Sequence, residues 1–201
     1  MSKRAKHDLH GAAPHHTRVA LLLVDVINAM DFPEGKLLAR YAKPAAKKIV
    51  ALKARAKAAG VPVIYANDNY GQWRSDFRAT VQNALAPGNP GRDIALMLAP
   101  EDDDYFVLKP KHSAFYGTTL ELLLSYLGCR RLVIAGFAGD ICIQFTARDA
   151  FLRDFELVIA RDCVASETAK ANREALAQMK DQLKASVVDG ARVDFEALRR
   201  A

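Results

Sequence analysis

The chain has 201 residues, of which 51% are apolar and 26% are charged, and its formal net charge is +6. This composition excludes a mainly disordered, collagen-like or low-complexity chain, and the length suits one domain. No apolar run approaches the roughly 20 residues that cross a bilayer, and the first 18 residues hold no stretch of signal-peptide type. We therefore expect a soluble, cytoplasmic protein that does not associate with a membrane.

Much of the positive charge lies at the N-terminus. Residues 1–18 carry two lysines and two arginines against a single aspartate, which accounts for +3 of the +6. The lysines further along the chain follow the solvated face of a helix and do not form the clustered basic patch of a nucleic-acid-binding protein. We predict a disordered basic tail over 1–17, a single domain over 18–201 and no nucleic-acid partner.

Short apolar runs alternate with amphipathic segments after the tail. Strands are predicted at 19–24, 61–66, 105–108, 132–135 and 155–160, with a short sixth at 186–189. Helices are predicted from Pro44 to Ala59, over about 76–86, from a Thr118/Glu121 capping box to Leu127, over 140–152 and over about 167–183, with a loop at 87–93. This order predicts an α/β fold, a three-layer α/β/α Rossmann-like sandwich with a mostly parallel sheet of five or six strands.

Reactive side chains follow three of these strands. Asp25 follows the first strand, Lys109 follows the third, and Cys142 lies about one turn into the helix after the fourth. Ligands of open parallel sheets bind at the carboxyl ends of the strands, so we expect these side chains to converge. With Asp140 as N-cap, Cys142 occupies the first helical turn, where the helix dipole and a nearby Lys109 favour the thiolate. Asp25 could then take the thiol proton and pass it to a leaving amine.

Three motifs in chain order carry a family resemblance. They read LLLVDVINAMDF, KPKHSAF and GFAGDICIQFTARDA. Together they resemble the isochorismatase-like cysteine hydrolase superfamily, which includes nicotinamidases and N-carbamoylsarcosine amidases, from about Arg18 to Ala165 and beyond. The resemblance implies Cys142 as nucleophile, Asp25 as general base and acid, and Lys109 as the third member of the triad.

The same resemblance implies details of the backbone and of assembly. A non-proline cis peptide bond is expected between Phe137 and Ala138, and the backbone amides of Ala138 and Cys142 are expected to form an oxyanion hole. Family members are often dimers or tetramers, so we expect a homodimer or homotetramer that acts on a small-molecule substrate.

One departure from the family pattern concerns a metal. Nicotinamidases carry an Asp-x-His metal motif after the second strand, where this chain reads NDNYGQWRSDF. Asp68 matches the first ligand position, but Asn69 and Tyr70 follow it, and no histidine occurs between residues 17 and 111. We therefore expect no metal, no other cofactor and no nicotinamidase activity, and the part that Asp68 plays stays open.

The remaining candidate residues could have purely structural roles. Cys129 and Cys163 are predicted to be packing residues, because three cysteines without close spacing predict neither a disulfide framework nor a zinc site. His112 is predicted to be a loop residue, and Arg74 is either a surface residue or a partner for an acidic substrate group or a neighbouring subunit. Candidate substrate contacts, each of which could instead belong to the core or to a loop, are Asn28, Phe32, Trp73, Phe115 and Phe137.

Three functions remain open at this stage. The first is a cysteine hydrolase that cleaves a C–N bond of a small amide, imide or ureido compound through a thioester. The second is an isochorismatase-type vinyl-ether hydrolase, which needs acid catalysis by Asp25 and no thiol. The third is a partner-binding domain with a relic site.

Overall fold

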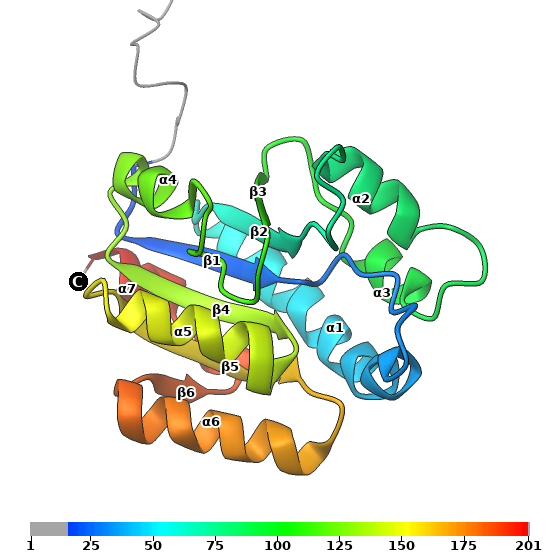
Figure 1. Cartoon of the computed structure of the whole chain (residues 1–201). Coiled ribbons are helices and arrows are strands. Elements are labelled where there is room, and N and C mark those ends of the chain that lie inside the picture. The colour runs from blue at the N-terminus through cyan, green and yellow to red at the C-terminus, as the bar shows by residue number, and fades with distance from the viewer. Residues whose placement is uncertain (1–15, 201) are drawn as a thin grey trace, which may run out of the picture.

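A parallel sheet forms the centre of the fold. The computed structural model describes residues 16–200, and its six strands lie in the order β3-β2-β1-β4-β5-β6 (Figure 1). All neighbouring strands pair in parallel. The strands are β1 (Val19–Val24), β2 (Val63–Asp68), β3 (Tyr105–Lys109), β4 (Arg131–Phe137), β5 (Glu156–Ala165) and β6 (Ser186–Val188).

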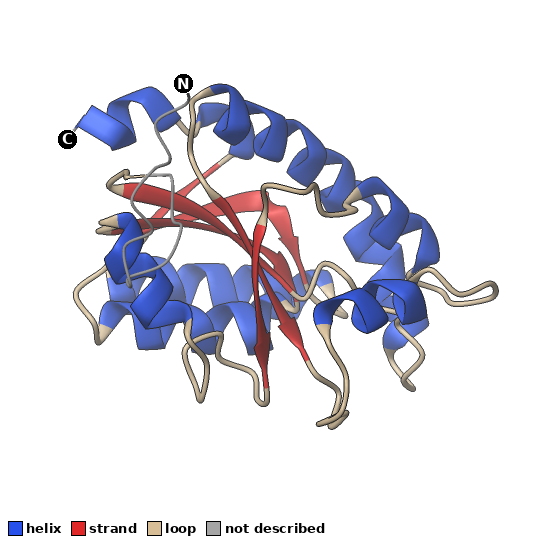
Figure 2. Ribbon diagram, turned by 90° about the horizontal axis from the view of Figure 1, so that it is seen from above, coloured by secondary structure: helices blue, strands red, loops and turns tan. Residues whose placement is uncertain are grey.

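Helices cover both faces of the sheet (Figure 2). They are α1 (Gly35–Ala58), α2 (Phe77–Ala84), α3 (Arg92–Met97), α4 (Leu120–Leu127), α5 (Gln144–Phe151), α6 (Ala169–Leu183) and α7 (Phe195–Arg200), with a π-helical turn η1 (Gly139–Ile143) and a 3-10 turn η2 (Gly190–Arg192). Buried side chains of α1, α2, α3 and α7 join one core cluster, and those of α4, α5 and α6 join the other. The predicted α/β/α sandwich is confirmed.

The position of β1 between two cores explains why its sequence is apolar throughout. Every residue of β1 is fully buried. Leu21 and Leu23 pack into one core cluster, whereas Ala20 and Leu22 pack into the other, because successive side chains of a strand point to opposite faces. None of the helices in residues 16–200 is long and apolar enough to cross a membrane.

Two predicted helix starts are wrong. Helix α1 begins at Gly35, and Pro44 lies inside it. Leu38 and Ala42 extend its buried face, and this packing outweighs the hydrogen bond that a proline removes. Helix α4 begins after Thr119 without a side-chain cap. Thr118 instead donates to the Ala114 carbonyl and accepts from the Leu120 N–H, so the expected capping box is absent from this helix.

Other boundaries also differ from the prediction. The short helices α3 and α7 were not predicted, because six residues carry too little periodicity to reveal a helix. Strand β5 continues to Ala165 rather than ending at Ala160. Most of the predicted tail lies outside the described residues, but Thr17 is buried and its N–H donates to the Leu127 carbonyl.

A glycine allows the two central strands to approach closely beside the site. Gly136 pairs with Val24 across β4 and β1 and has a φ of +127°. A Cβ atom there would lie 2.0 Å from the Val24 carbonyl oxygen, so no other residue fits. The close approach sets the end of β1 against the segment that leads to Cys142.

Candidate active site

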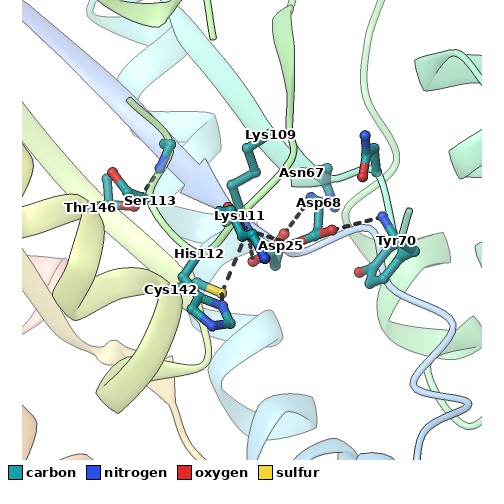
Figure 3. A network of polar contacts seen from close by, with 12 residues as sticks. Asp25, Asn67, Asp68, Tyr70, Lys109, Lys111, His112, Ser113, Cys142 and Thr146 are labelled. Atoms are coloured by element: carbon teal, nitrogen blue, oxygen red, sulfur yellow. Dashed lines mark hydrogen bonds and ion pairs between the residues drawn. The ribbon is translucent and has the colours of Figure 1, made fainter. Parts of the chain in front are cut away.

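Charged side chains gather at the carboxyl ends of three adjacent strands. Asp25 directly follows β1, Asp68 ends β2 and Lys109 ends β3. The sheet register pairs Asp68 with Lys109 directly. Figure 3 shows these side chains pointing toward one another, with Cys142 beside them.

Lys109 is the centre of this group. Its side chain is fully buried, and its Nζ lies 2.8 Å from Asp25 Oδ2 and 3.3 Å from Asp68 Oδ2. The same Nζ lies 3.6 Å from Cys142 Sγ. One ammonium therefore contacts two carboxylates and a thiol, so the predicted convergence of Asp25, Lys109 and Cys142 is observed.

The backbone fixes the orientation of Asp25. The Asp68 N–H donates to Asp25 Oδ1 at 2.7 Å, and the Asp25 N–H donates to the Ala66 carbonyl. Asp25 itself adopts a φ of +52°, a conformation that non-glycine residues rarely take and that clusters at functional sites. Its second oxygen, Oδ2, faces Lys109.

Cys142 belongs to a π-helical turn rather than to the predicted α-helix. The turn η1 begins at Gly139 with Ala138 as N-cap, so Asp140 is not the cap and Cys142 lies deeper than the predicted position. The peptide bond between Phe137 and Ala138 is cis, where the resemblance places one. Helix α5 then continues from Gln144.

The surroundings of Cys142 raise the pKa of its thiol, whereas the sequence predicts an environment that lowers it. Burial raises the pKa of the Cys142 thiol, the negative charge of Asp25 raises it further, and attraction to Lys109 lowers it by less. The sequence indicates the lysine and the helix dipole as influences on the thiol pKa, and the structure adds burial and the nearby negative charge of Asp25.

Both members of the Asp25–Lys109 pair have raised pKa values. Burial alone would lower the pKa of Lys109, but the negative charge of Asp25 and the contacts with Cys142 and Asp68 outweigh it, so the net pKa is raised. Burial raises the pKa of the Asp25 carboxyl, and Lys109 opposes that shift. Asp25 is therefore a stronger base than an ordinary aspartate while it remains in contact with the thiol.

The KPKHSAF segment adds a histidine beside the sulfur. His112 Nδ1 lies 3.9 Å from Cys142 Sγ, and its ring lies 5.5 Å from the Phe145 ring. The segment is anchored to α5 because the Ala114 N–H donates to Thr146 Oγ1 at 3.0 Å. The predicted loop position of His112 is therefore also a position in the site.

A small cavity opens onto this group. Its volume is about 170 Å³, below the roughly 300–1,000 Å³ of pockets for drug-sized ligands. Its walls are Asp25, Asn28, Phe32, Leu38, Asp68, Tyr70, His112, Phe137, Ala138, Ile141, Cys142 and Glu167. Three of the five candidate substrate contacts, Asn28, Phe32 and Phe137, are among them. The Asn28 Oδ1 also accepts from the Met30 N–H within the first loop.

The other two candidates lie elsewhere. Phe115 is buried in the core, where its ring packs against Phe155. The Arg153 guanidinium lies over the Phe115 ring, 5.0 Å from its centre. Trp73 is 77% exposed. With Arg74 it lines a separate, open hollow of about 590 Å³ that contains no cysteine, histidine or carboxylate.

Four polar residues of the cavity wall are missed or left undecided from the sequence: Asp68, Tyr70, His112 and Glu167. Asp68 and His112 could have been found by the same strand-end rule that selects Lys109. Glu167 could not, because β5 continues past its predicted end and brings the segment after Ala165 to the cavity.

The residues at the nicotinamidase metal-motif positions do not fit a metal ion. The Asp68 carboxylate faces the Lys109 ammonium, and Asn69 Oδ1 accepts from the Gly71 N–H. Within residues 16–200 no three His, Cys, Asp or Glu side chains are grouped as metal ligands would be.

Comparison with known proteins places the chain in a family. The family model described as the isochorismatase domain matches residues 19–192. The chain belongs to the isochorismatase family, as its three motifs indicate.

The chain is also similar to individual proteins of known sequence or structure. The chain is 42% identical over 168 residues to an uncharacterized isochorismatase family protein, YaaI, of Bacillus subtilis, covering 84% of this chain and 92% of the relative. It is 29% identical over 175 residues to the ureidoacrylate amidohydrolase RutB of Enterobacter sp., covering 75% of each protein. The crystal structure of the nicotinamidase/pyrazinamidase PncA from Bacillus subtilis is similar with a TM-score of 0.68 and 28% identity, over 86% of this chain and all of that one.

Proposed function

We propose that this chain is a cysteine hydrolase that cleaves the C–N bond of a small amide, imide or ureido compound through a thioester on Cys142. The observation that carries the proposal is the contact of one thiol with a buried carboxylate and a buried ammonium on the wall of a small cavity. The names of the relatives, an amidohydrolase and a nicotinamidase, support the same bond type.

The first half-reaction breaks the C–N bond. Cys142 Sγ attacks the substrate carbonyl carbon while its proton passes to Asp25, because burial and the Asp25 charge raise the pKa of the thiol and so favour its protonated form. The backbone amides of Ala138 and Cys142 donate to the oxyanion. Collapse of the tetrahedral intermediate expels the nitrogen, which takes the proton from Asp25 and leaves as ammonia or an amine.

The second half-reaction regenerates the thiol. Asp25 removes a proton from water, the hydroxide attacks the thioester carbonyl, and the C–S bond breaks. Sulfur leaves as the thiolate next to the Lys109 ammonium, which stabilises it until Asp25 returns the proton. One water is consumed per bond cleaved. An amide gives a carboxylic acid and ammonia or an amine, an imide gives a carboxylic acid and an amide, and a ureido compound gives carbamic acid and an amine.

Ammonia release from a panel of small amides and ureido compounds tests this proposal. Ureidoacrylate and nicotinamide belong in the panel as the substrates that name the relatives. We expect turnover of at least one compound by the wild type, and a loss of about 10⁴-fold or more in Cys142→Ala with unchanged circular dichroism. Turnover by Cys142→Ala near the wild-type rate would contradict a thioester mechanism. Cleavage of a vinyl ether by both the wild type and Cys142→Ala would select the acid-catalysed alternative.

We also propose that the enzyme acts in the cytoplasm as a homodimer or homotetramer. All three cysteines are free thiols, as expected in a reducing compartment. Light scattering of the purified protein should give two or four times the chain mass of 22.1 kDa. A single chain mass at micromolar concentration would overturn the oligomer.

A further inference from the structure

Glu167 is a cavity-wall carboxylate without a partner. It follows β5, is half-buried and lines the same cavity as Cys142. Within residues 16–200, no side chain or backbone group forms a hydrogen bond or ion pair with its carboxylate. No ammonium or guanidinium of the described residues offsets this charge, so a ligand in the cavity meets it without a protein counter-ion.

The charges of the site run in order along the sheet edge. The Lys109 ammonium lies at the β3 end, where Asp25 and Asp68 already neutralise it. Cys142 follows β4, and Glu167 follows the next strand, β5, on the side away from Lys109. A substrate whose carbonyl carbon meets Cys142 therefore shares the cavity with a carboxylate that no described residue neutralises.

Apart from the imidazole of His112, the described wall of the cavity holds no basic side chain. Among the described residues that line it there is no arginine and no lysine, and Lys109 lies fully buried behind the carboxylates. Arg74, the cation that the sequence analysis singled out for an acidic substrate group, lines the separate open hollow. The apolar walls Phe32 and Phe137 exclude water and so strengthen any charge effect inside.

We infer that Glu167 is a specificity-determining residue, which selects small amides whose end remote from the scissile bond carries a positive charge or a hydrogen-bond donor. Amides that carry a carboxylate at that end are disfavoured. The inference rests on the proposed function for the identity of the scissile bond, but the charge preference at Cys142 is measurable without any substrate.

The direct test uses two methanethiosulfonate reagents of similar size, one with an aminoethyl group and one with a sulfonatoethyl group. Each forms a disulfide with Cys142 as the S–S bond of the reagent breaks and methanesulfinate leaves. Peptide mass spectrometry separates Cys142 from the buried Cys129 and Cys163. The rate ratio of cationic to anionic reagent is divided by the ratio for a small free thiol.

We expect this normalised ratio to be about 10 or more in the wild type, so that the cationic reagent reacts faster than the anionic one. In Glu167→Gln the normalised ratio should be at least about threefold smaller than in the wild type. Glu174→Gln is the matched control, because it removes the same charge from an exposed position on α6 that does not line the cavity. A normalised ratio near one in the wild type, or equal ratios in the wild type and Glu167→Gln, would overturn the inference.

A second arm uses ammonia release from three amides of matched length: 4-aminobutanamide, pentanamide and 4-carbamoylbutanoate. We expect kcat/KM to fall in that order, and Glu167→Gln to improve the third relative to the first by about tenfold. A preference for the carboxylate that Glu167→Gln leaves unchanged would overturn the inference while the proposed function stands. The expected reagent ratios without hydrolysis of any compound, in this set or in the amide panel, would support the inference and count against the proposed function.

Discussion

Two buried lysines in this molecule each pair with carboxylates, and only one of them contacts a cysteine thiol. Lys53, on α1, lies 2.7 Å from the buried Asp104 and 3.0 Å from Glu101. Lys109 lies 2.8 Å from Asp25 and 3.3 Å from Asp68. Each lysine is buried and pairs with two carboxylates, although Glu101 is largely exposed and Asp104 also pairs with Lys57.

The two lysine clusters differ in the other side chains that contact the lysine. Lys53 also donates to the hydroxyl of Tyr65, which itself donates to the Leu98 carbonyl. Burial raises the pKa of Tyr65 to about 12, so this hydroxyl stays protonated and serves as a structural link between α1, β2 and the segment after α3. Lys109 instead contacts a thiol that opens onto a cavity. A buried ion pair is thus weak evidence for a site, and the reactive group beside it decides the function.

Asp25→Asn should cause the largest loss of activity among the variants of the two lysine clusters. Turnover should fall by about 10³-fold, because the proton acceptor for the thiol is lost. Alkylation of Cys142 at pH 7–9 should become faster, because removal of the Asp25 charge lowers the thiol pKa while Lys109 remains. Steady-state rates and peptide mass spectrometry measure the two effects. Slower alkylation in this variant would mean that Asp25 activates the free thiol.

Lys109→Met should change alkylation in the opposite direction. Without the ammonium the pKa of the Cys142 thiol rises further, so alkylation slows at every pH up to 10 and turnover falls by about 100-fold. The variant leaves Asp25 and Asp68 close together without their cation, which should cost about 3–5 kcal/mol of unfolding free energy. Urea unfolding gives the stability, and faster alkylation would contradict the geometry.

Lys53→Met is the matched control for that variant. It removes a buried ammonium, but Asp104 keeps its ion pair with Lys57 at 3.0 Å, so the loss of unfolding free energy should be smaller than in Lys109→Met. At a temperature where both variants are folded, its kcat/KM should stay within about twofold of wild type, because no member of its cluster lines the cavity beside Cys142. A loss of activity comparable with Lys109→Met would show that the two clusters are not functionally distinct.

His112→Asn should give the smallest change among the residues around the sulfur. The His112 side chain is exposed and lies 3.9 Å from Cys142, whereas Asp25 is buried against the thiol. We expect kcat/KM to fall less than about tenfold, with the acid limb of its pH profile unchanged. Loss of that limb would make His112, rather than Asp25, the base.

The sequence predicts the layers of the fold and the three reactive residues for one shared reason. Buried parallel strands read as short apolar runs, and their carboxyl ends meet at one edge. Asp25, Lys109 and Cys142 each follow such a run, so topology alone places them together. Pro44 misled the prediction of α1, because the energy of a buried helix face is a property of its packing partners.

The rest of the site depends on three-dimensional distances that no local pattern encodes. The raised pKa of Cys142 comes from burial and from a carboxylate more than a hundred positions away in the chain. Phe115 lies in the core because the loop turns its ring toward α5 and β5. Glu167 enters the cavity because β5 is longer than its apolar run.

Trapping with hydroxylamine tests the central claim, that Cys142 carries an acyl group during turnover. A thioester partitions between water and hydroxylamine, so the wild type should convert part of a hydrolysed amide into its hydroxamic acid. The hydroxamate fraction should rise with hydroxylamine concentration and be absent in Cys142→Ala. Carboxylic acid as the sole product at every hydroxylamine concentration, or hydroxamate formed equally by Cys142→Ala, would contradict the thioester.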